Sequence, residues 1–234
     1  MPKSFPYGAL PLIGGLAVIS LASVILFVLF SGQMMQSTTD RQPTYETNNP
    51  LITKVENGLE ITQPTITDTD PILGNPSAPV SVVVFSDFAC PYCKVLSQQL
   101  KSLVAANDNV RLVWKDFPIT TIHPDSGNAH IAAQCAAEQG KFWEYHDSLF
   151  ATQRDYNRAG LQARAQQLSL NGLDFSRCLD STKPIENISA DITEGQALNI
   201  DGTPYIFVND QRVSGLVSNT ELDQLIKLHS QLSE

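Results

Sequence analysis

Two cysteines separated by two residues, Cys90 and Cys93, are the side chains in this sequence best suited to chemistry. They enclose Pro91 and Tyr92 and follow directly after a short hydrophobic run. A cysteine at the first turn of a helix lies against unpaired backbone N–H groups and the positive end of the helix dipole, which favours the thiolate over the thiol. We therefore predict that Cys90 attacks disulfides and that Cys93, one turn further along, resolves the mixed disulfide.

The alternative for this pair is one half of a zinc site. A structural zinc ion needs four ligands, and the sequence has no second Cys-x-x-Cys or His-x-His pair to complete the set. We therefore favour redox chemistry and expect neither a metal nor an organic cofactor. The histidines lack the spacing of metal ligands and are interpreted as structural or surface residues: His123, His130, His146 and His229.

The elements that must position the two sulfur atoms follow from hydrophobic patterning. Residues 80–85 form a β-branched run that is typical of a buried central strand, and the run leads directly into the Cys-x-x-Cys helix. Residues 110–117 are a second strand candidate. Strand, helix and strand in this order predict a right-handed parallel unit.

The rest of the domain alternates between helix and strand patterns. From about residue 125 to 199 the apolar spacing is helical, and strand character returns at 205–208 and 212–213. A closing helix is expected from 219 to about 232. The sequence therefore predicts an α/β fold in which a helical segment interrupts the sheet.

Three motifs make this sequence resemble the DsbA-like thiol:disulfide oxidoreductases of bacteria. They are FSDFACPYC at 85–93, QGKFWEYHD at 139–147 and GTP at 202–204. The resemblance covers nearly all of residues 71–234 and implies a thioredoxin-like fold with an inserted helical domain at about 120–199. It also implies exchange of disulfides through the Cys-x-x-Cys pair.

The resemblance gives Thr203 and Pro204 a role in substrate binding. It implies a cis peptide bond at Pro204 facing the active-site disulfide, with the Thr203 backbone left free to pair with an extended substrate peptide. Pro91 and Tyr92, between the cysteines, are expected to contact substrate as well. The alternative is an ordinary trans proline that opens a strand.

Two positions near the cysteines, Val84 and Asp87, bear on how the resolving thiol loses its proton. Relatives often carry a glutamate six positions before the nucleophilic cysteine, where this chain has Val84. A buried acid there could accept the proton of the resolving thiol, so its absence leaves the proton route open. Asp87 is nearer to Cys90, and we expect it to cap the helix rather than take part in catalysis.

The other two cysteines, Cys135 and Cys178, stand 43 positions apart in the helical segment. We expect them to form a structural disulfide if the domain lies in an oxidising compartment. Closing a loop of that length stabilises a fold by up to about 4 kcal/mol in the chain-entropy model. The alternatives are two buried reduced thiols or a second redox pair.

The chain has 234 residues, a net charge of -9 and a pI near 4.8, so we expect no nucleic-acid binding. Residues 8–30 carry no charge and are long enough to span a bilayer as a helix. We predict a cytoplasmic segment at 1–7, a transmembrane anchor at 8–30, a polar linker at 31–70 and an extracytoplasmic domain at 71–234. A cleaved signal peptide is the alternative to the anchor.

Together these features predict a disulfide oxidase held at the cell membrane. Its clients would be reduced exported proteins, and a membrane redox partner would reoxidise the pair, as the resemblance implies. Two alternatives remain: a reductase or isomerase with the same cysteines, and a non-catalytic thioredoxin-like module that binds extended peptides.

Overall fold

The computed structural model describes residues 62–231. The predicted anchor at 8–30, the segment before it and nearly all of the predicted linker lie outside this range. No helix within residues 62–231 is both long and apolar enough to cross a membrane.

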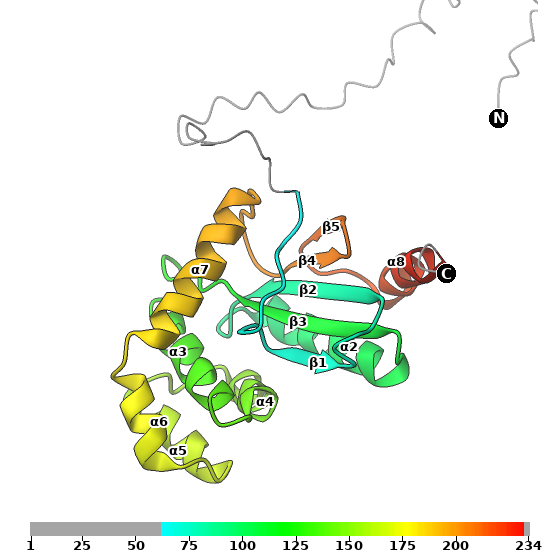
Figure 1. Cartoon of the computed structure of the whole chain (residues 1–234). Helices are drawn as coiled ribbons and strands as arrows, with labels where there is room; N and C mark the ends of the chain where they lie inside the picture. The colour runs from blue at the N-terminus through cyan, green and yellow to red at the C-terminus, as the bar shows by residue number, and fades with distance from the viewer. Residues whose placement is uncertain (1–61, 232–234) are drawn as a thin grey trace, which may run out of the picture. The chain divides into compact units, whose positions relative to one another are not determined.

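A five-stranded sheet forms the centre of the domain (Figure 1). The strands lie in the order β1-β3-β2-β4-β5. Only β2 and β3 run parallel, and the other neighbouring pairs are antiparallel. The parallel pair is the predicted strand–helix–strand unit. The strand bounds are β1 (Ile72–Gly74), β2 (Val80–Ser86), β3 (Val110–Asp116), β4 (Tyr205–Val208) and β5 (Gln211–Ser214).

Two helices outside the insertion pack on the sheet, α2 (Pro91–Ala106) and α8 (Asn219–Gln231). Between β3 and β4 the chain forms five consecutive helices, which Figure 1 shows beside the sheet. The prediction of an α/β thioredoxin-like fold with a helical insertion is therefore confirmed. The inserted helices are α3 (Ser126–Ala137), α4 (Phe142–Thr152), α5 (Arg158–Gln167), α6 (Gly172–Leu179) and α7 (Lys183–Ala197).

The central strand β2 is buried along its whole length, because both faces of the sheet are covered. Val82 and Val84 belong to the larger apolar cluster, with side chains of α2, α8 and the insertion. Val83 and Phe85 point to the opposite face and join a smaller cluster. On that second face α7 approaches so closely that a Cβ atom at Gly195 would lie 2.6 Å from the Phe117 ring. Packing on both faces fixes the position of the end of β2. The segment that carries Cys90 and Cys93 begins directly after that end.

Candidate active site

Cys90 is the N-cap residue of α2, with extended backbone angles of φ -76° and ψ 123°. Its Sγ atom accepts a hydrogen bond from the backbone N–H of Cys93 at 3.4 Å. Pro91 occupies the first turn, where a missing N–H leaves no helical hydrogen bond unmade. The sequence thus places the first sulfur against the free amides at the start of the helix.

The two sulfurs differ strongly in acidity. A hydrogen bond from the Cys93 side chain is the main cause that lowers the pKa of Cys90 to about 6, against the opposing effect of burial. Backbone N–H groups of Cys93 and Tyr92 and a hydrogen bond with Thr203 act in the same direction. Burial raises the pKa of the Cys93 thiol far above its ordinary value, since this residue is only 1% exposed. At neutral pH Cys90 is mostly a thiolate, and Cys93 keeps its proton.

Thr203 and Pro204 lie directly beside the reactive sulfur. Their peptide bond is cis, and the Thr203 carbonyl oxygen is 3.5 Å from the Cys90 Sγ atom. Pro204 is buried, and its carbonyl oxygen accepts a hydrogen bond from the Gly215 N–H at 2.9 Å. The structure therefore brings together four sequence-predicted residues from two distant parts of the chain.

The residues between the cysteines face solvent. Pro91 is exposed, and Tyr92 has 61% of its surface exposed although it is a large aromatic side chain. Both stand on the first turn of α2, next to the reactive sulfur. They are therefore accessible to a substrate that reaches Cys90.

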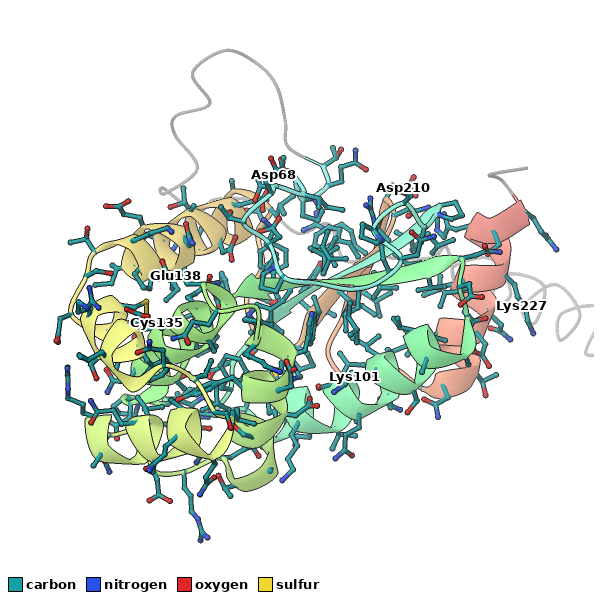
Figure 2. All side chains as sticks on the ribbon, turned by 60° about the horizontal axis from the view of Figure 1, so that its bottom comes forward. Asp68, Lys101, Cys135, Glu138, Asp210 and Lys227 are labelled. Carbon is teal, nitrogen blue, oxygen red and sulfur yellow. A yellow bond between two sulfur atoms is a disulfide. The ribbon has the colours of Figure 1, made fainter. Side chains whose placement is uncertain are left out.

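The remaining cysteines form a disulfide within the insertion. Cys135 of α3 and Cys178 of α6 have an S–S distance of 2.04 Å and a Cα–Cα distance of 5.6 Å. Figure 2 marks this position with the label Cys135. The bond joins two helices through cysteines that are 43 residues apart in the sequence, and Cys90 and Cys93 are the free thiols.

Asp87 has a different role from the predicted helix cap. The N-cap of α2 is Cys90, and Asp87 is completely buried. Its carboxylate accepts hydrogen bonds from the backbone N–H groups of Ala89 (2.8 Å) and Ile119 (2.9 Å) and from the Ser126 hydroxyl. Asp87 thus ties the end of β2 to the loop after β3, a long-range contact that local sequence does not reveal.

Two histidines complete the surroundings of Asp87. His123 places Nδ1 2.9 Å from the Asp87 carboxylate, and His130 places Nε2 3.8 Å from it. His130 also lies 2.5 Å from a carboxylate oxygen of Asp116. Burial opposes protonation of His130, but the two carboxylates raise its pKa to about 9. Burial likewise opposes the charge of Asp87, yet the His130 hydrogen bond holds the pKa of Asp87 well below its usual range.

Two residues in the segment that follows α4 also fix the cysteine loop, and the sequence did not suggest either. Gln153 donates to the carbonyl oxygens of Phe88 (3.0 Å) and Cys90 (2.8 Å). The Tyr156 hydroxyl donates to the Phe88 carbonyl at 2.9 Å. The helical insertion therefore supports the active-site backbone directly.

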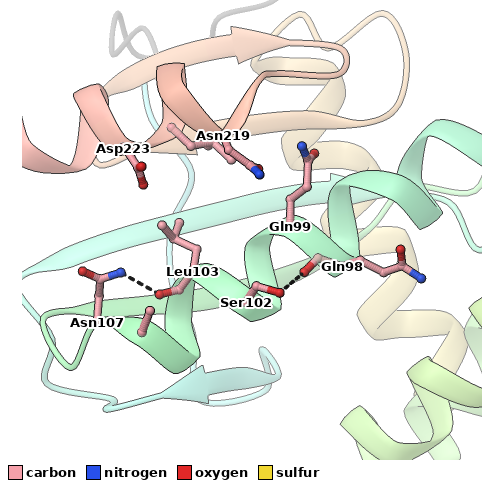
Figure 3. A pocket seen from close by; sticks show the side chains of 9 residues that line it. Gln98, Gln99, Ser102, Leu103, Asn107, Asn219 and Asp223 are labelled. Carbon is pink, nitrogen blue, oxygen red and sulfur yellow. Dashed lines mark hydrogen bonds between the residues drawn. The ribbon is translucent and has the colours of Figure 1, made fainter.

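An open pocket of about 390 Å³ lies between α2 and α8 (Figure 3). Gln98, Gln99 and Ser102 line it from α2, and Asn219 and Asp223 line it from α8. Neither reactive cysteine contributes to its walls. Within residues 62–231 no group of three or more histidine, cysteine or acidic side chains is arranged to hold a metal ion.

Comparisons with known proteins agree with this architecture. A family model described as Thioredoxin matches residues 66–228. A Na(+)/H(+) antiporter NhaA 3 of Salinispora tropica is 36% identical over 165 residues, which are 70% of this chain and 25% of that protein. The chain thus spans about a quarter of the length of this curated relative, whose name describes a longer protein.

Solved structures show the same fold. A thioredoxin-like oxidoreductase from Silicibacter pomeroyi DSS-3 is 31% identical, with a TM-score of 0.65 over 70% of this chain and 94% of that chain. BdbD from Bacillus subtilis has a TM-score of 0.63 at 24% identity, over the same shares of the two chains. The sequence-based family prediction is confirmed. The chain belongs to the thioredoxin family, and its domain has the fold of the DsbA-like thiol–disulfide oxidoreductases that its sequence resembles.

Proposed function

We propose that this protein is an extracytoplasmic thiol:disulfide oxidase that introduces disulfides into exported proteins. The observation that carries the proposal is the position of Cys90 at the start of α2, where Cys93 and the backbone amides lower its pKa to about 6. A stabilised thiolate favours the reduced form of the pair, and a pair that prefers to be reduced oxidises other thiols.

The reaction proceeds by two thiol–disulfide exchanges. A client thiolate attacks Cys90 in the Cys90–Cys93 disulfide, so a mixed disulfide forms at Cys90 and Cys93 leaves as a thiolate that takes up a proton. A second client thiolate then attacks the client sulfur in the mixed disulfide. The client leaves with its own disulfide, and Cys90 leaves as the stabilised thiolate.

Both cysteines are buried, Cys90 with 5% and Cys93 with 1% of its surface exposed, so the direction of attack is inferred from their neighbours. Cys90 borders the exposed Pro91 and Tyr92, whereas Cys93 lies one turn further into α2. The backbone at Thr203 lies next to Cys90, where an extended client segment could align with it. A client sulfur therefore reaches Cys90 and not Cys93.

The proposed location rests on two features. Residues 8–30 are an uncharged apolar stretch of membrane-spanning length. The Cys135–Cys178 disulfide is typical of proteins that function outside the reducing cytoplasm. We propose that the domain stands on the extracytoplasmic side of the cell membrane and that a membrane redox partner reoxidises it.

The first experiment mixes the oxidised full chain with a reduced peptide that contains two cysteines and follows formation of the peptide disulfide. We expect Cys90→Ala to abolish the reaction. Cys93→Ala, whose Cys90 is a free thiol, is mixed instead with a disulfide-linked dimer of a peptide that contains one cysteine. Its Cys90 thiolate should attack that disulfide, release one peptide as a thiolate and keep the other as a stable mixed disulfide. The double variant Cys135→Ala/Cys178→Ala is the control and should retain the reaction. Peptide oxidation that survives in Cys90→Ala, or the absence of any mixed disulfide in Cys93→Ala, would refute the assigned roles.

A reductase or isomerase would use the same two sulfurs, and a peptide-binding module would use neither. An isomerase would rearrange a client with wrongly paired cysteines faster than it oxidises a reduced client. A binding module would hold the peptide equally well after Cys90→Ala. Running both client types on the same variants separates the three functions.

A further inference from the structure

Cys93 borders a small internal cavity of about 10 Å³, which is about the space that one water molecule needs. Val84, Ser86, Ser97 and His146 line this cavity together with Cys93. Apolar side chains close the remainder. Of the residues that line it, only Cys93 and His146 carry groups whose ordinary pKa lies between about 6 and 9.

His146 is arranged to accept a proton from the cavity side. Its Nδ1 atom is 2.9 Å from a carboxylate oxygen of Asp147, and its Nε2 atom is 3.2 Å from the Ser97 hydroxyl. The Nδ1–H group donates to the carboxylate, so Nε2 is the acceptor for the Ser97 hydroxyl. Burial lowers the pKa of His146 despite the nearby Asp147 carboxylate, which keeps the imidazole neutral in its resting state.

The remainder of the His146 ring is surrounded by aromatic side chains. Five of them have centroids 4.9 to 6.1 Å from that of the imidazole, so the ring orientation is fixed and only its nitrogen atoms meet polar partners. They are Phe88, Trp114, Phe142, Trp143 and Phe150. A proton on His146 can therefore move only toward Ser97 or toward Asp147.

Asp147 connects this buried histidine to solvent. Its side chain is 49% exposed, and it also forms an ion pair with Lys101 of α2. His146 itself is only 1% exposed. The order of contacts from the inside outward is the cavity beside Cys93, then Ser97, His146, Asp147 and solvent.

Asp87 is the other acidic residue near the cysteines, and its carboxylate oxygens already have hydrogen-bond partners. The Asp87 carboxylate already accepts from two backbone amides and the Ser126 hydroxyl and also contacts His123. Val84 is an apolar wall of the same cavity, and none of the residues that line it is acidic. Among these lining residues, His146 is therefore the base that can accept the proton.

We propose that Ser97 and His146 relay the proton of Cys93 to and from Asp147 at the surface. This inference rests on the proposed exchange reaction. When the pair closes, the Cys93 proton passes through one water molecule in the cavity to the Ser97 oxygen, while the Ser97 proton passes to His146 Nε2. The Nδ1 proton leaves through Asp147. The Cys93 sulfur forms a bond with the Cys90 sulfur. The bond between Cys90 and its partner sulfur breaks, and the partner leaves with the electron pair as a thiolate.

The test follows oxidation of the reduced full chain by excess oxidised glutathione in a stopped-flow instrument. Attack of Cys90 on glutathione disulfide is the bimolecular step, and attack of Cys93 on the resulting mixed disulfide is the unimolecular closure. We expect Ser97→Ala and His146→Phe to slow closure at least tenfold at pH 7, since general acid–base groups contribute about 10²–10⁴-fold. The bimolecular step should stay within about twofold of the native rate.

The pH profile separates a relay from a merely structural role. With the relay, the native closure rate should change little between pH 6.5 and 9, because His146 stays neutral over that range. In both variants closure should rise with pH, because hydroxide must remove the proton. Ser97→Thr keeps the hydroxyl and should restore native closure. Ser102→Ala is a control on the same helix, since its hydroxyl bonds only its own backbone turn at Gln98.

Native closure rates and pH profiles in both Ser97→Ala and His146→Phe would overturn the relay. If the native chain showed no bimolecular step with glutathione disulfide, the proposed chemistry at Cys90 would fail first, and the relay with it. The two failures appear in different kinetic phases and are therefore distinguishable.

Discussion

The low pKa of Cys90 depends mainly on one neighbour, and removing that neighbour should raise it by a measurable amount. The Cys93 side chain is the largest influence that lowers this pKa to about 6. A hydrogen bond to a charged group contributes about 1.5–3 kcal/mol. At 1.36 kcal/mol per pKa unit, Cys93→Ala should raise the pKa of Cys90 by about one to two units.

The magnitude has a clear consequence at pH 7. With a pKa of about 6, about nine-tenths of Cys90 is thiolate. After Cys93→Ala this fraction should fall to one-half or less. The backbone N–H of residue 93 remains in the variant, so some of the shift from the ordinary value of 9.0 should persist.

Thiolate absorbance in the ultraviolet, followed from pH 4 to 10, measures this pKa directly. Cys135 and Cys178 are bonded to each other and do not titrate. Cys93→Ser is the matched control, because a serine hydroxyl still donates to the thiolate and should keep the pKa low. An unchanged pKa in Cys93→Ala would refute the reasoning and assign the shift to the helix amides alone.

Three further outcomes concern stability. Cys135→Ala with Cys178→Ala should lower the free energy of unfolding in denaturant by up to about 4 kcal/mol, because a 43-residue loop is opened. Lys115→Met should lower the free energy of unfolding by about 3–5 kcal/mol, because three acidic side chains that lie within 3.3 Å of this buried ammonium would lose their partner. Lys227 is exposed, so Lys227→Met is the control and should change the free energy of unfolding by less than about 0.5 kcal/mol. His130 has a pKa of about 9 in the folded chain, above its ordinary 6.5. The stability that its charge contributes is therefore complete below pH 6.5 and is lost as the pH rises through 9. The free energy of unfolding, measured in denaturant between pH 7 and 10, should show this loss in the native chain and not in His130→Gln.

Much of the fold could be predicted because the decisive signals were local. The β-branched run that became β2 and the Cys-x-x-Cys helix after it have clear apolar periodicities. The strand β1 was not predicted, since its three residues, Ile72–Gly74, are partly buried or exposed and are too few to show a period of two. Its place in the sheet depends on antiparallel pairing with β3.

The chemistry-bearing sulfurs could be predicted from spacing, but their surroundings could not. Asp87 was expected to cap the Cys-x-x-Cys helix and is instead a buried centre of hydrogen bonds, because its partners come from the loop after β3 and from α3. Gln153 supports the cysteine loop from 63 residues away. His146 was interpreted as structural, because no sequence pattern shows that Ser97 of another helix lies beside it. Contacts of this kind depend on how the insertion packs against α2.

The reduction potential of the Cys90–Cys93 pair, measured by equilibrating the full chain in glutathione buffers at pH 7, tests the central claim most directly. A thiolate with a pKa of about 6 instead of 9.0 makes the reduced form more favourable by about 1.4 kcal/mol at pH 7, which corresponds to about 30 mV. The account predicts a potential at least about 30 mV less negative than that of thioredoxin, that is, less negative than about −240 mV. A potential near about −270 mV, that of thioredoxin, would contradict it and would make the protein a reductase.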